Sequence, residues 1–298
     1  MVSTSPLPAS LASFEWTGSG GITLSASAAG PLGASTGVLF AHGFGQTRQA
    51  WTRSMLALGN TGVGSAAWDL RGHGQSGRNA PGQTYTVEQF IDDALAIRAT
   101  LPDPPVLVGA SMGGLVGLAA QARGARFAGL VLVDVTPKWE IAGMQRILAF
   151  MGAHPDGFDD HEHAANEIAA YLPHRRERKS SAELAHLLVR GGDGRLRWHW
   201  DPRLLQDLAD SAKHQDELAD AARGIDVPVL LVSGGRSDLV SKETVAHFLE
   251  LVPHAEHVHL PDATHMVAGD DNDAFTRAVL SFLSPRPHAG SFQTLRGA

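Results

Sequence analysis

The chain has 298 residues, of which 43% are hydrophobic and 18% are charged, and its 24 Lys and Arg against 31 Asp and Glu give a formal charge of −7. It contains no cysteine, which excludes a disulfide framework, a thiolate metal site, an iron–sulfur cluster and a cysteine nucleophile. The acidic balance argues against nucleic acid as a partner, because that affinity depends mainly on Lys and Arg neutralising phosphates.

The sequence gives no sign of a membrane segment or a targeting segment. No uninterrupted apolar run reaches the roughly 18 residues needed to cross a bilayer. The stretch Met1 to Leu11 has no Lys or Arg ahead of its apolar residues, which argues against a secretory signal peptide. We therefore expect a cytoplasmic protein without a membrane partner, and the oligomeric state is left open.

Short apolar runs alternate with helix-length segments along most of the chain. The runs that are typical of strands covered on both faces span 37–41, 63–70, 105–109, 128–135 and 227–233. The segments at helical spacing span 86–100, 113–123, 241–251 and 273–283. This alternation predicts an α/β fold with a mainly parallel central sheet and helices on both faces.

The alternation stops at Pro137 and resumes near Gly224. Between these positions there is no strand-like run, and many His, Trp and paired charges gather there. We expect a core formed by residues 11–136 and 222–284, with a helical cap inserted at 137–221. The composition of residues 1–10 and 285–298, rich in Ser, Pro, Gly and Ala, predicts flexible tails.

A GxSxG pattern centred on Ser111 marks a candidate nucleophile. The pattern alone is weak, since the chain contains 33 glycines. Its context is stronger, because a strand-like run ends just before Gly109 and a helix-compatible run begins at Met112. A serine on such a sharp strand-to-helix turn needs small neighbours, and the helix amino terminus points its free N–H groups at any oxyanion formed there.

With this motif the sequence resembles the α/β-hydrolase family over nearly all of residues 36–284. His42-Gly43-Phe44-Gly45 resembles the family's HGxG loop, and residues 69–77 resemble its D-x-R-G-H-G-x-S loop. The resemblance implies a Ser-His-Asp triad without a metal or cofactor. It also implies an oxyanion hole formed by the backbone N–H groups of Phe44 and Met112.

The same resemblance suggests the other two triad members. Asp238 ends the segment Gly234-Gly235-Arg236-Ser237-Asp238, where the family places its acid, and His265 follows the next short strand. Asp134, at the end of an earlier strand, is the alternative acid position in parts of the family. Asp238 is preferred because it follows a long buried strand and precedes His265 by one helix and one strand.

Two features of the expected cap bear on ligands. Trp139, Met144, Phe150, Trp198 and Trp200 could line a substrate pocket, or could simply form the core of the cap. Three histidines between His154 and His163 could be read as a metal site, but Gly and Pro in that segment leave the ligand geometry undefined. We therefore expect no metal.

These residues predict a serine esterase or lactonase that cleaves small to medium apolar esters through an acyl-enzyme. A serine at the elbow argues against dehalogenases and epoxide hydrolases, which use Asp, and the lack of cysteine argues against dienelactone hydrolases. A C–C bond hydrolase or a perhydrolase- or haloperoxidase-like esterase on the same triad remains an alternative. A non-catalytic ligand sensor is a more distant one, because a sensor does not need the complete set of reactive groups.

Overall fold

The computed structural model describes residues 10–30, 37–172, 184–209, 211–267 and 272–284. Nearly all of the two expected tails, at 1–9 and 285–298, lies outside these residues. Within them, none of the helices combines the length and the apolar composition needed to span a membrane.

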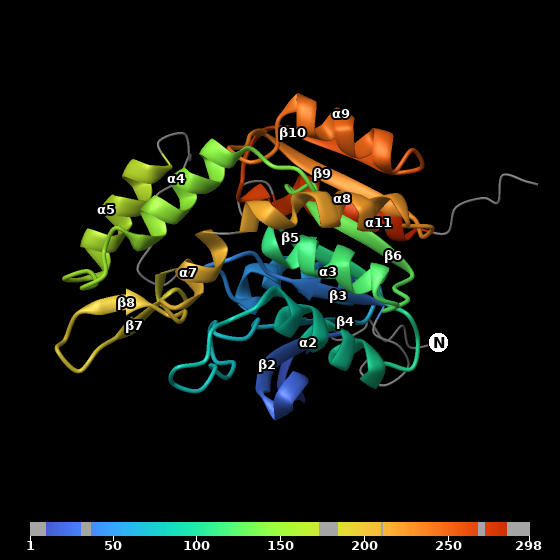
Figure 1. Ribbon diagram of the computed structural model, residues 1–298. Helices are drawn as coiled ribbons and strands as arrows, with labels where there is room; N and C mark the ends of the chain where they lie inside the picture. The colour runs from blue at the N-terminus through green and yellow to red at the C-terminus, as the bar shows by residue number, and fades with distance from the viewer. Residues whose placement is uncertain (1–9, 31–36, 173–183, 210, 268–271, 285–298) are drawn as a thin grey trace, which may run out of the picture.

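An eight-stranded sheet forms the centre of the molecule (Figure 1). Its order is β1-β2-β4-β3-β5-β6-β9-β10, and every pair from β4 to β10 is parallel. The strands are β1 (Leu11–Thr17), β2 (Thr23–Ala29), β3 (Val38–Ala41), β4 (Ser65–Trp68), β5 (Val106–Ala110), β6 (Gly129–Val133), β9 (Val229–Arg236) and β10 (Glu256–Thr264). The predicted α/β fold with a mainly parallel sheet is confirmed.

The antiparallel hairpin β1–β2 at one edge of the sheet was not predicted. The residues of β1 are mostly exposed or half-buried, and those of β2 are mostly small. The apolar-run criterion used for the central strands therefore misses both of them.

Two layers of helices cover the two faces of the sheet. One face carries α2 (Val87–Thr100), α3 (Met112–Ala122), α8 (Gln215–Arg223) and α9 (Lys242–Leu251), and the other carries α1 (Thr52–Asn60) and α11 (Asn272–Leu283). The strand residues alternate between two buried clusters: Leu107 belongs to the first and Val108 to the second. Burial on both faces explains why these strands are continuous apolar runs.

The insertion between β6 and β9 lies beyond one end of the sheet (Figure 1). It contains α4 (Ile141–Gly152), α5 (His161–Tyr171), an antiparallel pair β7 (Leu188–Arg190) and β8 (Leu196–Trp198), and α7 (Leu204–Ala209). The expected helical cap thus also contains a pair of strands, which the sequence did not predict because strands of three residues are too short to show a period. The next helix, α8, packs on α3 of the core.

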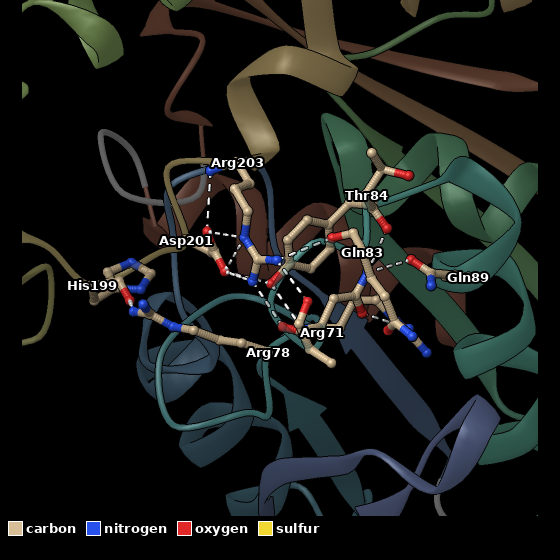
Figure 2. Close-up of polar contacts among 11 residues, drawn as sticks. Arg71, Arg78, Gln83, Thr84, Gln89, His199, Asp201 and Arg203 are labelled. Carbon is tan, nitrogen blue, oxygen red and sulfur yellow. Dashed lines mark hydrogen bonds and ion pairs between the residues drawn. The ribbon is translucent and has the colours of Figure 1, made fainter.

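A polar network fixes the end of the insertion to a core loop (Figure 2). The Arg203 guanidinium donates to the backbone oxygens of Asn79, Ala80 and Gln83 at 2.8–3.0 Å, and it pairs with Asp201 at 2.6 Å. The Tyr85 hydroxyl donates to Asp201 at 2.9 Å. Because one guanidinium satisfies three carbonyls of the loop, the segment around residue 203 has a defined position on the core.

Candidate active site

Ser111 lies on the sharp turn between β5 and α3, with φ 47° and ψ −120°. A non-glycine residue in this region of backbone space is strained, and such strain is common at functional sites. Hydrogen bonds hold the turn in place. The Ser111 N–H donates to the Val133 oxygen at 3.0 Å, and the Ser111 oxygen accepts from Gly114 and Leu115 at 2.9 and 3.1 Å.

The glycines of the GxSxG pattern are required by close backbone packing. A Cβ atom at Gly109 would lie 2.5 Å from the Gly113 oxygen, and one at Gly113 would lie 2.5 Å from the Ala41 oxygen. Any larger side chain would push α3 away from the ends of β5 and β3. The glycines thus allow the turn that presents Ser111 above the sheet.

The loop that follows β3 is braced by histidines. His42 Nδ1 donates to the Gly43 oxygen at 2.8 Å, and its Nε2 accepts from the Leu70 N–H at 2.9 Å. On the other side of the loop, His199 Nδ1 accepts from the Gly74 N–H at 2.7 Å, and its Nε2 donates to the Gly45 oxygen at 3.2 Å. His199 comes from the insertion, so the insertion helps to position the loop that contains Phe44.

Three buried histidines, His42, His73 and His199, form a cluster beside this loop. The rings of His42 and His73 are 5.1 Å apart, and those of His73 and His199 are 6.0 Å apart. Burial lowers the pKa of His42 to about 3 and that of His199 to about 4, and it lowers the pKa of His73 well below 6.5. All three are therefore neutral near pH 7, and the paired donor and acceptor roles of His42 and His199 require this.

Asp134, rather than Asp238, lies beside His265. His265 Nδ1 is 2.7 Å from Asp134 Oδ2, and the Asp134 side chain is fully buried. The other Asp134 oxygen accepts from the Gly234 N–H at 2.8 Å, and Ser237 Oγ donates to Oδ2. Like Ser111, Asp134 has a positive φ, of 50°. The expected pairing of Asp238 with His265 is thus corrected.

Asp238 instead forms an ion pair with Arg146 of α4, at 2.5 Å. Its side chain is 31% exposed, and its backbone oxygen lies against Gly143, where a Cβ atom would collide. Burial, assisted by the Asp238 charge, raises the pKa of nearby Tyr171 to about 12. Asp238 therefore joins the insertion to the core rather than orienting His265.

A single cavity of about 1010 Å³ connects these groups. Ser111, His265, Phe44 and Met112 all line it. Met112 is the first residue of α3, so its N–H has no acceptor within the helix and can face the cavity.

Four of the five predicted pocket residues line this cavity: Trp139, Met144, Phe150 and Trp198. The prediction for Trp200 is corrected, because Trp200 is not among the lining residues. It is 3% exposed and packs against Phe44, with ring centres 4.8 Å apart. The sequence could not separate it from Trp198, because Trp200 lies beyond the end of β8 (Leu196–Trp198), where the alternation of side chains along a strand no longer applies.

The histidines of the insertion do not gather around a metal position. His154 contacts Glu167 at 3.2 Å, and His163 contacts Asp159 at 3.1 Å. Among the residues that the structure describes, no group of three or more His, Cys, Asp or Glu side chains could hold a metal ion.

The sequence and the fold are both similar to those of known hydrolases. A sequence profile of the Alpha/beta hydrolase family matches residues 38–278. The 3-hydroxybutyrate-oligomer hydrolase of Cupriavidus necator is 33% identical over 211 residues, which cover 66% of this chain and 71% of that protein.

An esterase of Mycobacterium tuberculosis is 29% identical over 265 residues, which cover 85% of each protein. A crystal structure of that esterase superimposes with a TM-score of 0.71, over 93% of this chain and 92% of the other. The crystal structure of an E-2-(acetamidomethylene)succinate hydrolase superimposes with a TM-score of 0.77 at 25% identity, over 92% of this chain and 99% of the other.

The glycine contacts predict a position-specific loss of stability. We expect Gly113→Ala to lower the free energy of unfolding by about 1–3 kcal/mol, because the added methyl group collides with backbone that cannot rotate away. Gly192→Ala is the matched control, since a Cβ atom there meets nothing within 4 Å. Urea unfolding of both variants checks this, and equal losses would contradict the packing explanation.

The buried histidines predict a loss of stability in acid. The folded-state pKa of His199, about 4, lies below its ordinary value of 6.5, so the unfolded chain takes up the proton first as the pH falls. Above pH 6.5 there is no penalty, and toward pH 4 this one residue removes about 3 kcal/mol.

Unfolding in urea across this pH range tests whether the burial of His199 contributes to the loss of stability in acid. His199→Gln keeps one donor and one acceptor but cannot be protonated, so it should lose less stability in acid than the wild type, while His42 and His73 still contribute to the loss. His186→Gln, at an exposed position, should leave it as in the wild type. If His199→Gln and the wild type lose stability equally, the burial of His199 does not control acid sensitivity.

Proposed function

Because the chain belongs to the alpha/beta hydrolase family, we propose that it is a serine hydrolase that cleaves carboxylic esters through an acyl-enzyme on Ser111. The observation that carries this proposal is that His265, which lines the same cavity as Ser111, is hydrogen-bonded to the buried Asp134. That pair supplies the base and the orienting acid that a serine nucleophile requires.

In the first half of the reaction, Ser111 Oγ attacks the ester carbonyl carbon while His265 Nε2 takes the hydroxyl proton. The carbonyl oxygen gains negative charge, and the N–H groups of Phe44 and Met112 stabilise it. The bond from carbon to the alkoxy oxygen then breaks, and His265 returns its proton to the departing alcohol. The product is an ester of Ser111 with the acid.

In the second half, His265 takes a proton from water, whose oxygen attacks the acyl carbon. The bond from that carbon to Ser111 Oγ breaks, and the proton passes from His265 to the serine. Asp134 stabilises the imidazolium in both halves and holds His265 Nδ1 as the donor. The carboxylate fits this role because the Gly234 N–H and the Ser237 hydroxyl fix its orientation.

The cavity and the relatives favour apolar esters as substrates. At about 1010 Å³ the cavity is at the upper end of ordinary ligand pockets, and aromatic and aliphatic side chains form much of its wall. Two relatives carry ester chemistry in their names, an esterase and a 3-hydroxybutyrate-oligomer hydrolase. We therefore favour an ester with an apolar acyl group, and the volume favours a medium rather than a small one.

Replacing the nucleophile tests the proposal most simply. Ser111→Ala should lower kcat on p-nitrophenyl butyrate by at least about 10⁴-fold, because no acyl-enzyme can form. A fluorophosphonate should add mass to the intact wild-type protein and not to the variant. Wild-type turnover by the variant would remove Ser111 from the mechanism, and an unlabelled wild type would favour a non-catalytic ligand sensor.

The choice of acid is tested by a pair of isosteric variants. Asp134→Asn should lower kcat by about 10³–10⁴-fold, because the amide cannot hold His265 in the required tautomer. Asp238→Asn should change kcat by less than about tenfold, since Asp238 pairs with Arg146. Loss of activity at Asp238 but not at Asp134 would reverse the assignment.

A further inference from the structure

One face of α3 forms the floor of the cavity over the whole length of the helix. The cavity-lining residues on this face are Met112, Leu115, Val116, Ala119 and Ala122 of α3, followed by Arg123 at its C-cap. Their spacing of three and four residues places them on a single side of the helix. From Met112 to Ala122 the helix rises about 15 Å, so the cavity extends well beyond the reacting groups near Ser111.

The neighbouring helices supply the walls along α3. In the ribbon, α3 runs between α2 and α8 (Figure 1), and it packs against both. Val87, Phe90 and Ile91 of α2 line the cavity, as do Leu218 and Ala221 of α8. The α8 residues are again on one helical face. The wall along α3 is therefore mainly apolar on both sides.

The far end of this groove is charged and open to solvent. Glu88, Arg123 and Glu217 line the cavity there and are exposed, and His214 lies beside Glu217 at 3.1 Å. The pKa of Glu88 is lowered, first by hydrogen bonds from its own backbone and Thr86, and further by the charges of His214 and Arg123. The rim is thus formed by Arg123 at the C-cap of α3 together with Glu88 and Glu217 from the first turns of α2 and α8.

A second arm of the cavity lies on the side of His265. It is lined by Met266, Val267, Gln46, Gln49 and Arg53. Gln46 Nε2 contacts Met266 Sδ at 3.4 Å, which places the Gln46 side chain beside His265. This arm is more polar than the groove along α3.

The chemistry decides which part of an ester occupies which arm. The departing alcohol must receive a proton from His265, so its oxygen has to lie on the His265 side. The acyl carbon stays bound to Ser111, next to Met112, where the groove along α3 begins. The groove is therefore placed to hold the acyl chain while the alcohol leaves by the more polar arm.

We propose that the groove along α3 binds a linear, apolar acyl chain and determines which chain lengths bind best. The groove ends at the charged rim formed by Glu88 and Arg123. At about 1.25 Å per carbon, a 15 Å floor accommodates about twelve carbons. The inference rests on the proposed role of Ser111, but it adds a substrate class: esters of medium-chain linear acids. Carbons beyond the rim enter water and contribute no further binding.

Acyl-length profiles test the groove. On p-nitrophenyl esters from acetate to palmitate, wild-type kcat/KM should rise by up to about fourfold per added methylene and level off near twelve carbons. Ala119→Phe blocks the floor about 10 Å from Met112 and should move the plateau to about eight carbons, whereas Ala122→Phe, at about 15 Å, should affect only the longest chains. On the acetate ester, which is too short to reach either position, both should lose less kcat/KM than on the long esters.

Ala99→Phe is the matched control, because Ala99 is exposed on α2 and does not line the cavity. It should reproduce the wild-type profile. The groove is overturned if wild-type activity does not rise beyond butyrate, or if the two α3 variants and the control give the same profile. Labelling of Ser111 by a short fluorophosphonate, measured in every variant, separates this failure from failure of the serine mechanism itself.

Discussion

The candidate active site depends on the hydrogen bond between His265 and Asp134, and this bond in turn requires a particular strand order and backbone conformation. It joins residues 131 positions apart. It forms only because β6, β9 and β10 are neighbouring parallel strands, so that the carboxyl ends of β6 and β10 lie on the same side of the sheet. Asp134 also needs a left-handed backbone, with φ 50°. Such strain persists because the surrounding structure fixes it: the Asp134 N–H donates to the Val232 oxygen at 2.7 Å, and Gly234 and Ser237 hold the carboxylate.

The loop that would hold the oxyanion depends on residues from distant parts of the chain. His42 ties it to the end of β4, and His199 ties Gly45 to Gly74 from the far end of the insertion. Arg203 and Asp201 then fix that end of the insertion to the core. The insertion therefore contributes to the preorganisation of the reacting groups as well as to the wall of the cavity.

The central elements could be predicted because their signals are local. Strands buried on both faces appear as apolar runs, and the close packing at Gly109 and Gly113 leaves a glycine pattern around Ser111. The hairpin β7–β8 could not be predicted, because its strands have three residues each and are buried only through their contacts with α5 and Phe158. A three-residue strand shows no period.

The preference for Asp238 over Asp134 as the acid is wrong for a related reason. Asp134 and Asp238 both follow a buried strand, and which carboxylate turns toward His265 depends on the backbone at each strand end. The segment Gly234 to Asp238 does not supply the acid; its Gly234 and Ser237 instead hydrogen-bond the Asp134 carboxylate. The positive φ at Asp134 is the feature that distinguishes the two, and no sequence pattern reveals it for a non-glycine residue.

The central claim is that Ser111, His265 and Asp134 act as one unit, and a double-variant cycle measures this directly. Residues that work as a unit show strongly non-additive losses. The kcat/KM of the double variant Ser111→Ala with Asp134→Asn should equal that of Ser111→Ala alone, because without the nucleophile the orientation of His265 no longer matters. If the two losses multiply instead, Asp134 stabilises the protein or binds substrate independently of Ser111, and the account is wrong.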